Sequence, residues 1–265
     1  MRPISILICV LITLPALAQV PGANWAGSDD VAFYLDFEDT TYAWKAAGNA
    51  YQFGYNFELV DGGVQGKAWR ATNKMGYIGF DGLGNVPLEA ATVSMYVKSG
   101  DTNIFADGRP HYLAAFCRTI EGMIARRDLW PEQGLSVSLR KSEGNTLDFV
   151  AHVGGDEWNW EAEEIVMVSA DVSELDPAEW HHVAFSWDFP SRRVWLVIDG
   201  EATEGTIPEA VRRPYEYLAA LFGNTYNYTA ESQQPLGGLM DEIAILSVPW
   251  PEAQQVMAGD APITA

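Results

Sequence analysis

The sequence has few cysteines, and no internal disulfide can form once its first segment is removed. It contains two cysteines among 265 residues, Cys9 and Cys117, and Cys9 lies in the apolar run at the start of the chain. A single remaining cysteine has no intramolecular partner. Stability must therefore come from packing or from a bound metal ion.

Basic residues are also scarce. The chain has 16 Lys and Arg against 36 Asp and Glu, which gives a formal net charge of −20 at pH 7. Such a surface repels the phosphates of nucleic acids and of anionic lipid headgroups. The composition therefore argues against nucleic-acid and membrane-surface partners.

The only long apolar run lies within the first 18 residues, which have the pattern of a secretory signal peptide. Arg2 forms the charged start, residues 4–14 the apolar stretch and residues 16–18 a small-x-small cleavage motif. The apolar stretch is too short to span a bilayer. We therefore expect a protein that is secreted or held in the cell envelope or periplasm, without insertion into the membrane. We also expect a monomer. The expected organisation is a signal peptide at 1–18, a lead-in at 19–30, one domain at 31–259 and a tail at 260–265.

The chain is rich in short runs that alternate apolar and polar residues. The clearest are residues 181–188 and 193–199, separated by a segment that contains Pro190. Successive side chains of a strand point to opposite faces, so these runs predict a β-hairpin with one apolar face on each strand. The pair Asp199-Gly200 is typical of a tight turn into a further strand.

Similar runs, separated by Gly, Asn and Asp, recur along the chain. Residues 40–56 are expected to form a long loop with one short strand. Residues 251–258 form the only expected helix, with Pro near its start and Gly259 after its end. This pattern predicts an all-β fold, an antiparallel sandwich of two sheets with one short C-terminal helix. The other expected strands are residues 31–37, 57–60, 67–71, 77–80, 92–98, 111–118, 134–141, 146–153, 217–223 and 239–248.

Six segments form a set that is characteristic in its order along the chain. They are residues 64–68, 76–78, 92–98, 179–188, 196–200 and 237–245. Together they resemble the laminin-G-like, concanavalin A-like jelly rolls, over residues 31–258. The resemblance implies a two-sheet jelly roll that often binds glycans or mediates adhesion, sometimes with a structural calcium ion. One branch of the family consists of β-glucanases.

The resemblance also implies where calcium would bind. Related folds place the ion between an acidic residue after the first strand, a carbonyl in a Gly-rich turn and the aspartate of an Asp-Glu pair, which correspond here to Glu38, Gly66 and Asp241. Asp36 is a further carboxylate near the first strand. Calcium binds such carboxylate and carbonyl oxygens. The alternative is that Asp241 only accepts backbone hydrogen bonds in a turn, while the other carboxylates are solvated.

His181 and His182 do not predict a zinc site. They are adjacent on an expected strand, so their side chains point to opposite faces and cannot share an ion. We expect each to be a surface or hydrogen-bonded histidine.

One segment is similar to a catalytic motif. On a strand, Glu157, Asn159 and Glu161 would share a face, which resembles the Glu-x-Asp-x-Glu strand of laminarinase-like β-glucanases. Here the central aspartate is replaced by asparagine, and the flanks, including Glu163-Glu164, have the composition of a loop. The sequence also contains no Gly-x-Ser-x-Gly elbow. A non-catalytic protein is therefore expected.

Aromatic residues in polar surroundings are candidates for sugar binding, because an exposed ring offers a flat apolar surface to a sugar ring. A neighbouring amide can hydrogen-bond to sugar hydroxyls. The alternative is that these residues belong to the core. The candidates, in order of preference, are Trp158 with Trp160, Tyr226 with Asn227 and Tyr228, and Trp44 with Tyr51.

The leading hypothesis is an exported, non-catalytic module that binds a glycan or a glycosylated surface, with calcium stabilising the sandwich. The first alternative is a protein-interaction or structural surface domain without sugar binding. The second is a β-glucanase that uses Glu157 and Glu161. A fold by itself does not decide among these functions.

Overall fold

The structure is a computed structural model that describes residues 23–74, 76–117, 136–153, 163–213, 219–224 and 236–258. The predicted signal peptide and the predicted tail lie outside the described residues. Of the expected lead-in, residues 23–30 are described. Within the described ranges, no helix has the length and the apolar character needed to cross a membrane.

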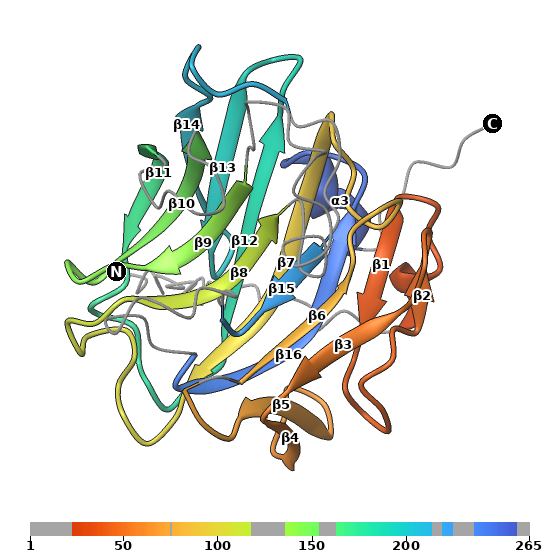
Figure 1. Ribbon diagram of the computed structural model, residues 1–265, viewed down its shortest axis with the longest axis vertical. Coiled ribbons are helices and arrows are strands. Elements are labelled where there is room, and N and C mark those ends of the chain that lie inside the picture. Colours follow the sequence, from red (N-terminus) through yellow and green to blue (C-terminus); the bar gives the residue numbers. More distant parts are fainter. Residues whose placement is uncertain are drawn as a thin grey trace, which may run out of the picture.

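The described residues form two antiparallel sheets packed face to face, with short helices at their margin (Figure 1). This confirms the predicted two-sheet sandwich. The nine-stranded sheet contains β1 (Val31–Leu35), β2 (Lys45–Ala46), β4 (Phe57–Asp61), β5 (Lys67–Ala71), β7 (Ala90–Ser99), β12 (His181–Asp188), β13 (Arg193–Ile198), β14 (Glu201–Thr206) and β16 (Gly238–Leu246). The seven-stranded sheet contains β3 (Gln52–Tyr55), β6 (Tyr77–Asp81), β8 (His111–Cys117), β9 (Ser136–Lys141), β10 (Thr146–Val153), β11 (Glu163–Asp171) and β15 (Ala219–Phe222). The helices are α1 (Ala23–Ala26) and α3 (Glu252–Met257).

The order of the strands brings the ends of the chain together. In the nine-stranded sheet the main path is β14-β13-β12-β7-β16-β1-β2, so the last strand lies between β7 and the first strand. Val31 is paired with Leu246 and Leu35 with Ile243. The other sheet runs β11-β10-β9-β8-β15-β6-β3. The first and last strands of the described residues are therefore direct neighbours.

The hairpin predicted from residues 181–199 forms as expected. Val183 of β12 pairs with Ile198 of β13, and Asp188 pairs with Arg193. Asp199 and Gly200 have φ values of 50° and 87° and turn the chain into β14. The left-handed conformation at both positions explains why the turn needs residues such as Asp and Gly.

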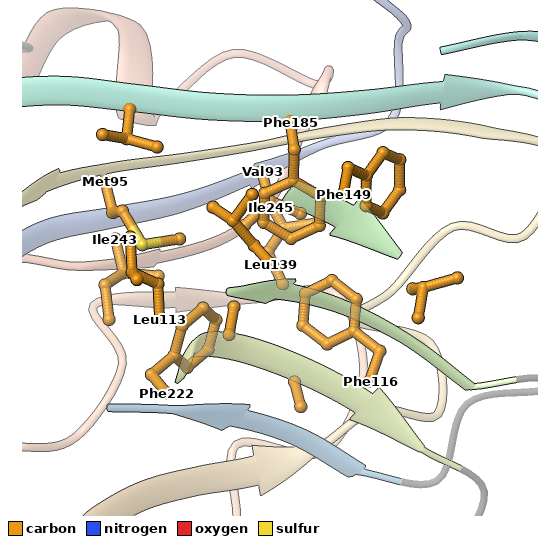
Figure 2. Packing of buried hydrophobic residues seen from close by; sticks show 14 of the residues in the cluster. Val93, Met95, Leu113, Phe116, Leu139, Phe149, Phe185, Phe222, Ile243 and Ile245 are labelled. Carbon is orange, nitrogen blue, oxygen red and sulfur yellow. The ribbon is translucent and has the colours of Figure 1, made fainter. Parts of the chain in front are cut away.

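The main core lies between the two sheets (Figure 2). Aromatic rings from both sheets meet there, with ring centroids of Phe149 and Phe185 5.0 Å apart and those of Phe116 and Phe185 5.7 Å apart. Burial of each such side chain contributes roughly 2–3 kcal/mol relative to exposure. A core of this size can hold the sandwich together without a disulfide.

A second, smaller core covers the outer face of the nine-stranded sheet. Trp195 and Val197, which alternate with the inward residues of β13, pack there with Trp25 of α1, Trp250 and residues of α3. The sequence did not predict α1, because four residues are too few to show a helical period. This face of the sandwich is therefore closed by the chain itself.

Three elements differ from the expectation. Residues 40–56 contain two short strands, β2 and β3, rather than one. Glu163 and Glu164, expected in a loop, begin β11 and pair with Val153 and His152. Most residues of β11 are at least partly exposed, so the strand has too little apolar alternation to be recognised.

Candidate cation site and exposed aromatic residues

The first candidate metal residues lie just after β1. Phe37 has a φ of 58°, which is uncommon for a bulky residue, and its side chain is fully buried in the main core. Asp36 and Glu38 on either side of it are only partly buried. This backbone conformation anchors the end of β1 while leaving both carboxylates outside the core.

A bulge in β16 places two more carboxylates outside the core. Asp241 lies opposite Tyr96, but Ala244 already lies opposite Ser94, and Glu242 has a φ of 53°. An extra residue in one strand of an antiparallel pair shifts the register in this way. Because Met240 and Ile243 both belong to the main core, Asp241 and Glu242 between them are turned away from it.

The turn between β4 and β5 receives two of these carboxylates. A Cβ atom on Gly66 would lie 1.9 Å from Oε2 of Glu38, and one on Gly63 would lie 2.6 Å from Oδ2 of Asp241. The backbone N–H of Val64 donates to Oδ2 of Asp241 at 2.7 Å. Only glycine leaves room for the carboxylates at these two positions. The structure therefore brings Glu38, Gly66 and Asp241 to one place, while their role as metal ligands stays a prediction.

Burial makes the charged form of both β16 carboxylates costly. Burial and the nearby charge of Glu242 together raise the pKa of Asp241 to about 8, against the lowering effect of hydrogen bonds from backbone N–H groups. Burial likewise raises the pKa of Glu242 to about 7, with the charges of Asp36 and Glu38 contributing. The hydroxyl of Tyr34 donates a hydrogen bond to Glu242, and burial raises the pKa of Tyr34. A cation near these groups would favour their ionised forms.

One buried carboxylate oxygen has no partner within the part of the chain that the structure describes. Oε1 of Glu38 finds no hydrogen-bond donor among these residues, which is costly for a carboxylate oxygen. Asp241 does accept backbone hydrogen bonds, from Val64 and from Glu242, as the alternative interpretation expects. That interpretation does not explain Oε1 of Glu38, which a hard cation would satisfy.

The donor set fits calcium only if oxygens other than side-chain carboxylates take part. The carbonyl of Gly66 already accepts hydrogen bonds from the N–H groups of Gly62 and Gly63, at 2.9 and 3.1 Å. In the part of the chain that the structure describes, no three His, Cys, Asp or Glu side chains are grouped so that they could hold an ion. Calcium commonly combines carboxylates with carbonyl and water oxygens, so two carboxylates at a backbone turn are compatible with it.

The preferred sugar-binding residues cannot be placed. They lie outside the described residues, as does the pair considered for catalysis. These residues are Trp158, Trp160, Tyr226, Asn227 and Tyr228 for binding, and Glu157 and Glu161 for catalysis.

The third pair of aromatic candidates is exposed, but its members pack on different sheets. The exposed fractions of Trp44 and Tyr51 are 59% and 58%. The ring of Trp44 packs edge-on against Tyr34 of the nine-stranded sheet, with centroids 6.2 Å apart. Tyr51 lies next to Phe53 of the seven-stranded sheet, with centroids 6.3 Å apart. They therefore belong to two separate surfaces.

Sequence reasoning missed Tyr42 and Tyr55, which are also exposed. Tyr55 shares its strand with Phe53, and the alternation of Tyr51, Phe53 and Tyr55 is visible in the sequence. It was hidden within a segment interpreted mainly as loop.

Three residues on β9, β10 and β11, Ser138, His152 and Glu164, have the residue types of a hydrolase triad but not its geometry. Oγ of Ser138 and Nε2 of His152 are 2.9 Å apart. Nδ1 of His152 is 3.7 Å from Oε1 of Glu164, beyond hydrogen-bond distance, and Glu164 pairs with Arg140 at 2.8 Å. Ser138 is only 2% exposed, so its hydroxyl is not available to a substrate. The trio connects three strands and does not form a nucleophile.

The side chains of the two adjacent histidines point to opposite faces of the strand, as predicted. His181 contacts Oδ2 of Asp199 through Nδ1 at 2.8 Å, and its ring lies edge-on to Phe105. His182 is within 2.8 Å of Oγ of Ser94 on the other face of the strand. Neither geometry resembles a shared metal site.

Comparison with known proteins identifies the class to which this fold belongs. A family model for the concanavalin A-like lectin/glucanases superfamily, of the laminin G type, matches residues 72–254. The match covers more than half of the sequence, and the chain therefore belongs to this superfamily. No curated protein matches the sequence.

Solved structures support the same assignment. The binding domain of botulinum neurotoxin serotype G has a TM-score of 0.57 and 13% identity, over 87% of this chain and 50% of that one. The ligand-binding domain of serotype D, in complex with N-acetylneuraminic acid, has a TM-score of 0.57 and 12% identity, over 91% and 53%. This chain thus spans about half the length of these toxin domains.

A smaller structure is matched along nearly its whole length. Domain 4 of AbnA, a GH43 extracellular arabinanase from Geobacillus stearothermophilus, in complex with arabinotriose, has a TM-score of 0.53 and 18% identity. The match covers 86% of this chain and 97% of that one. At these identities the similarity establishes a shared fold.

Proposed function

We propose that this chain is an exported, non-catalytic module that binds a neutral glycan, and that a structural calcium ion stabilises it. The observation that carries the proposal is the presence of exposed aromatic rings on a scaffold of the concanavalin A-like superfamily. Among the described residues, the large hydrophobic side chains that are most exposed are Tyr42 and Trp44, at 63% and 59%. Exposed rings of this kind are the usual apolar surface for sugar rings.

The matched structures support a sugar as the ligand, and the two sugars named with them differ in charge. Domain 4 of the arabinanase is described with arabinotriose, and the serotype D domain with N-acetylneuraminic acid. The first sugar is neutral and the second is an acid. Because this chain has a net charge of −20, a neutral glycan meets less repulsion than an acidic one.

The calcium ion would be held by Glu38 and Asp241 with carbonyl and water oxygens. Bound there, the ion would offset the negative charge of these buried carboxylates. It would also tie the turn between β4 and β5 to the ends of β1 and β16. Export rests on the signal-peptide pattern of residues 1–18.

The function is tested by binding of the purified protein to a panel of polysaccharides in millimolar calcium and in chelator. We expect saturable binding to a neutral polysaccharide, and weaker binding to acidic ones. Absence of binding across the panel would contradict the proposal and would favour a protein-interaction or structural surface domain.

The non-catalytic part of the proposal has its own test. The purified protein is expected to leave laminarin and lichenin intact on prolonged incubation. Hydrolysis of either polymer, and its loss in Glu157→Gln, would contradict this part and favour a β-glucanase.

A further inference from the structure

The two faces of strand β3 carry different kinds of side chain. Tyr51, Phe53 and Tyr55 alternate with Gln52 and Gly54. A Cβ atom on Gly79 of β6 would lie 2.3 Å from Cε2 of Phe53, and Gly79 lies between the inward residues Ile78 and Phe80. Since alternate residues share a face, the three aromatic side chains lie on the outer face of the seven-stranded sheet.

The rings form a continuous row. The centroids of Tyr51 and Phe53 are 6.3 Å apart, those of Phe53 and Tyr77 6.3 Å, and those of Tyr55 and Tyr77 4.9 Å. Tyr77 of β6 is paired directly with Tyr55. We name these four residues, Tyr51, Phe53, Tyr55 and Tyr77, the aromatic ladder. From Tyr51, directly before β3, to Tyr55 at the end of the strand it extends about 13 Å, enough for more than one sugar ring.

Two rings of the aromatic ladder are packed against the sheet, and the other two are accessible to solvent. Tyr77 is only 5% exposed and packs with Leu221 and Ala115, while Phe53 is partly buried against them. Tyr51 and Tyr55 are 58% and 37% exposed. Rings that are fixed from below lose little conformational freedom when a ligand covers them.

The ladder lies at an open edge of the sandwich. Strand β3 is the last strand of its sheet and, among the described strands, pairs only with β6 (Figure 1). Edge strands are commonly protected by charged residues or proline, and β3 has neither. An exposed aromatic row at such an edge is typical of a binding surface.

Polar groups at one end of the ladder suit a hydroxylated ligand. Nδ2 of the exposed Asn49 donates to Oδ2 of Asp81 at 3.2 Å, and the N–H of Asp81 donates to the carbonyl of Tyr51. An amide and a carboxylate side by side can donate to and accept from neighbouring hydroxyl groups. A carboxylate at this position, in a chain with a net charge of −20, disfavours an anionic ligand.

We propose that the aromatic ladder is a binding site for a linear neutral oligosaccharide, which lies along β3 with its ring faces on Tyr51 and Tyr55 and its hydroxyl groups at Asn49 and Asp81. This inference rests on the proposed function and specifies the site and the class of ligand. It is independent of the aromatic residues at 158–160 and 226–228.

The experiment measures affinity for laminarin, linear arabinan, xylan and galactan by affinity electrophoresis and calorimetry, with the full protein and four variants. Tyr51→Ala and Tyr55→Ala should each weaken binding of the preferred polymer roughly three- to tenfold, because each removes one ring contact. Tyr51→Phe should bind almost as the parent does if the ring face carries the contact. Val166→Ala is the matched control, since it shortens an apolar side chain that is 47% exposed on β11, at the opposite edge of the same sheet.

Each outcome separates the site from the function. If the parent binds a polymer and both ladder variants bind it equally well, the ladder is wrong but the proposed function stands. If the parent binds none of the polymers, the proposed function fails and the inference fails with it. An equal loss in Val166→Ala would also overturn the ladder, because the effect would not depend on position.

Self-association through the edge of β3 is the competing use of this surface. It would appear in sedimentation as a dimer that Tyr51→Ala or Tyr55→Ala dissociates, with glycan binding unchanged. That result would overturn the inference. A monomeric parent whose melting temperature matches that of both variants, together with their weaker binding, would support it.

Discussion

Two places among the described residues depart from the usual distribution of side chains in opposite ways. At the bulge of β16, the carboxylates of Asp241 and Glu242 are buried, at 0% and 1% exposure. At the edge strand β3, the rings of Tyr51 and Tyr55 are exposed. Burying a carboxylate opposes folding, whereas a ring that stays exposed contributes little to folding.

The difference between the two places indicates what kind of ligand each would accept. A cation would lower the cost of the buried carboxylates, and an apolar sugar face would cover the exposed rings. The carboxylate site lies at a turn fixed by glycine, so its contribution is expected in stability. In the aromatic ladder, Tyr51 and Tyr55 are exposed while the other two rings are packed beneath them. The exposed rings of the ladder are therefore expected to contribute to ligand binding and not to stability.

Gly63→Ala should destabilise the protein by about 3–5 kcal/mol, because added side-chain atoms in tight packing are among the most damaging changes. Its Cβ would lie 2.4 Å from the carbonyl oxygen of Lys67 and 2.6 Å from Oδ2 of Asp241. Gly62→Ala is the matched control, because nothing lies within 4 Å of its Cβ and only its φ of 94° opposes the change. That control should cost about 1–2 kcal/mol. Equal denaturant midpoints for the two variants would show that the turn does not enclose the carboxylate.

The pH dependence of stability should reveal a buried group outside both sites. Burial lowers the pKa of His182 to about 4. The unfolded chain, with an ordinary histidine pKa of about 6.5, therefore binds this proton more readily than the native state does. Stability should fall by about 3 kcal/mol as the pH decreases from 6.5 to 4.

His182→Gln should remove that dependence, as measured by urea unfolding across this pH range. His181 is the neighbouring control, because its effect on the pH dependence of stability has the opposite sign. Its hydrogen bond to Asp199 raises its pKa, so its contribution is present below the unfolded pKa and is lost as the pH rises through the folded one. Identical pH profiles for His182→Gln and the parent would contradict the burial of His182.

Calcium should stabilise the parent by about 2.7 kcal/mol at one hundred times its dissociation constant, as expected for an ion that binds only the native state. Glu38→Gln should abolish most of this gain, because Oε1 of Glu38 has no other partner. Glu209→Gln changes an exposed glutamate elsewhere and should leave the gain unchanged. The measurement is the melting temperature with calcium and with chelator. A melting temperature that does not respond to either would remove the calcium proposal.

Tyr51→Ala should have the smallest effect on stability, within about 0.5 kcal/mol, because the ring is largely in solvent. Phe53→Ala should cost more, since Phe53 packs on the base of the ladder. Chemical denaturation of both variants checks this order. If Tyr51→Ala proved as destabilising as Phe53→Ala, the ring would be part of the fold and not a free binding surface.

Much of the fold followed from local patterns in the sequence. The hairpin was predictable because Val183, Phe185 and Trp187 share one strongly apolar face and a turn signal follows. The strands that were missed lack such a signal. In β11 most residues are at least partly exposed, and in β3 the aromatic residues alternate on the outer face while glycine and glutamine occupy the other.

The carboxylate site was predictable only through the resemblance. Spacing along the chain could not bring Glu38 next to Gly66, nor show that the Gly66 carbonyl would already be hydrogen-bonded. The bulge that turns both Asp241 and Glu242 outward depends on the pairing of β16 with β7. Such features arise from tertiary contacts, and local alternation does not encode them.

The position of β16 between β7 and β1 also governs when this protein can fold. Tyr34 and Glu242, which meet across these strands, are 208 residues apart in the sequence. Until the last part of the chain has emerged, β1 lacks its main neighbour, and the nine-stranded sheet lacks the strand that joins its two parts. Contacts of such long range slow folding. A chain that is threaded through a membrane while still incomplete would therefore remain open until its C-terminal strand has crossed.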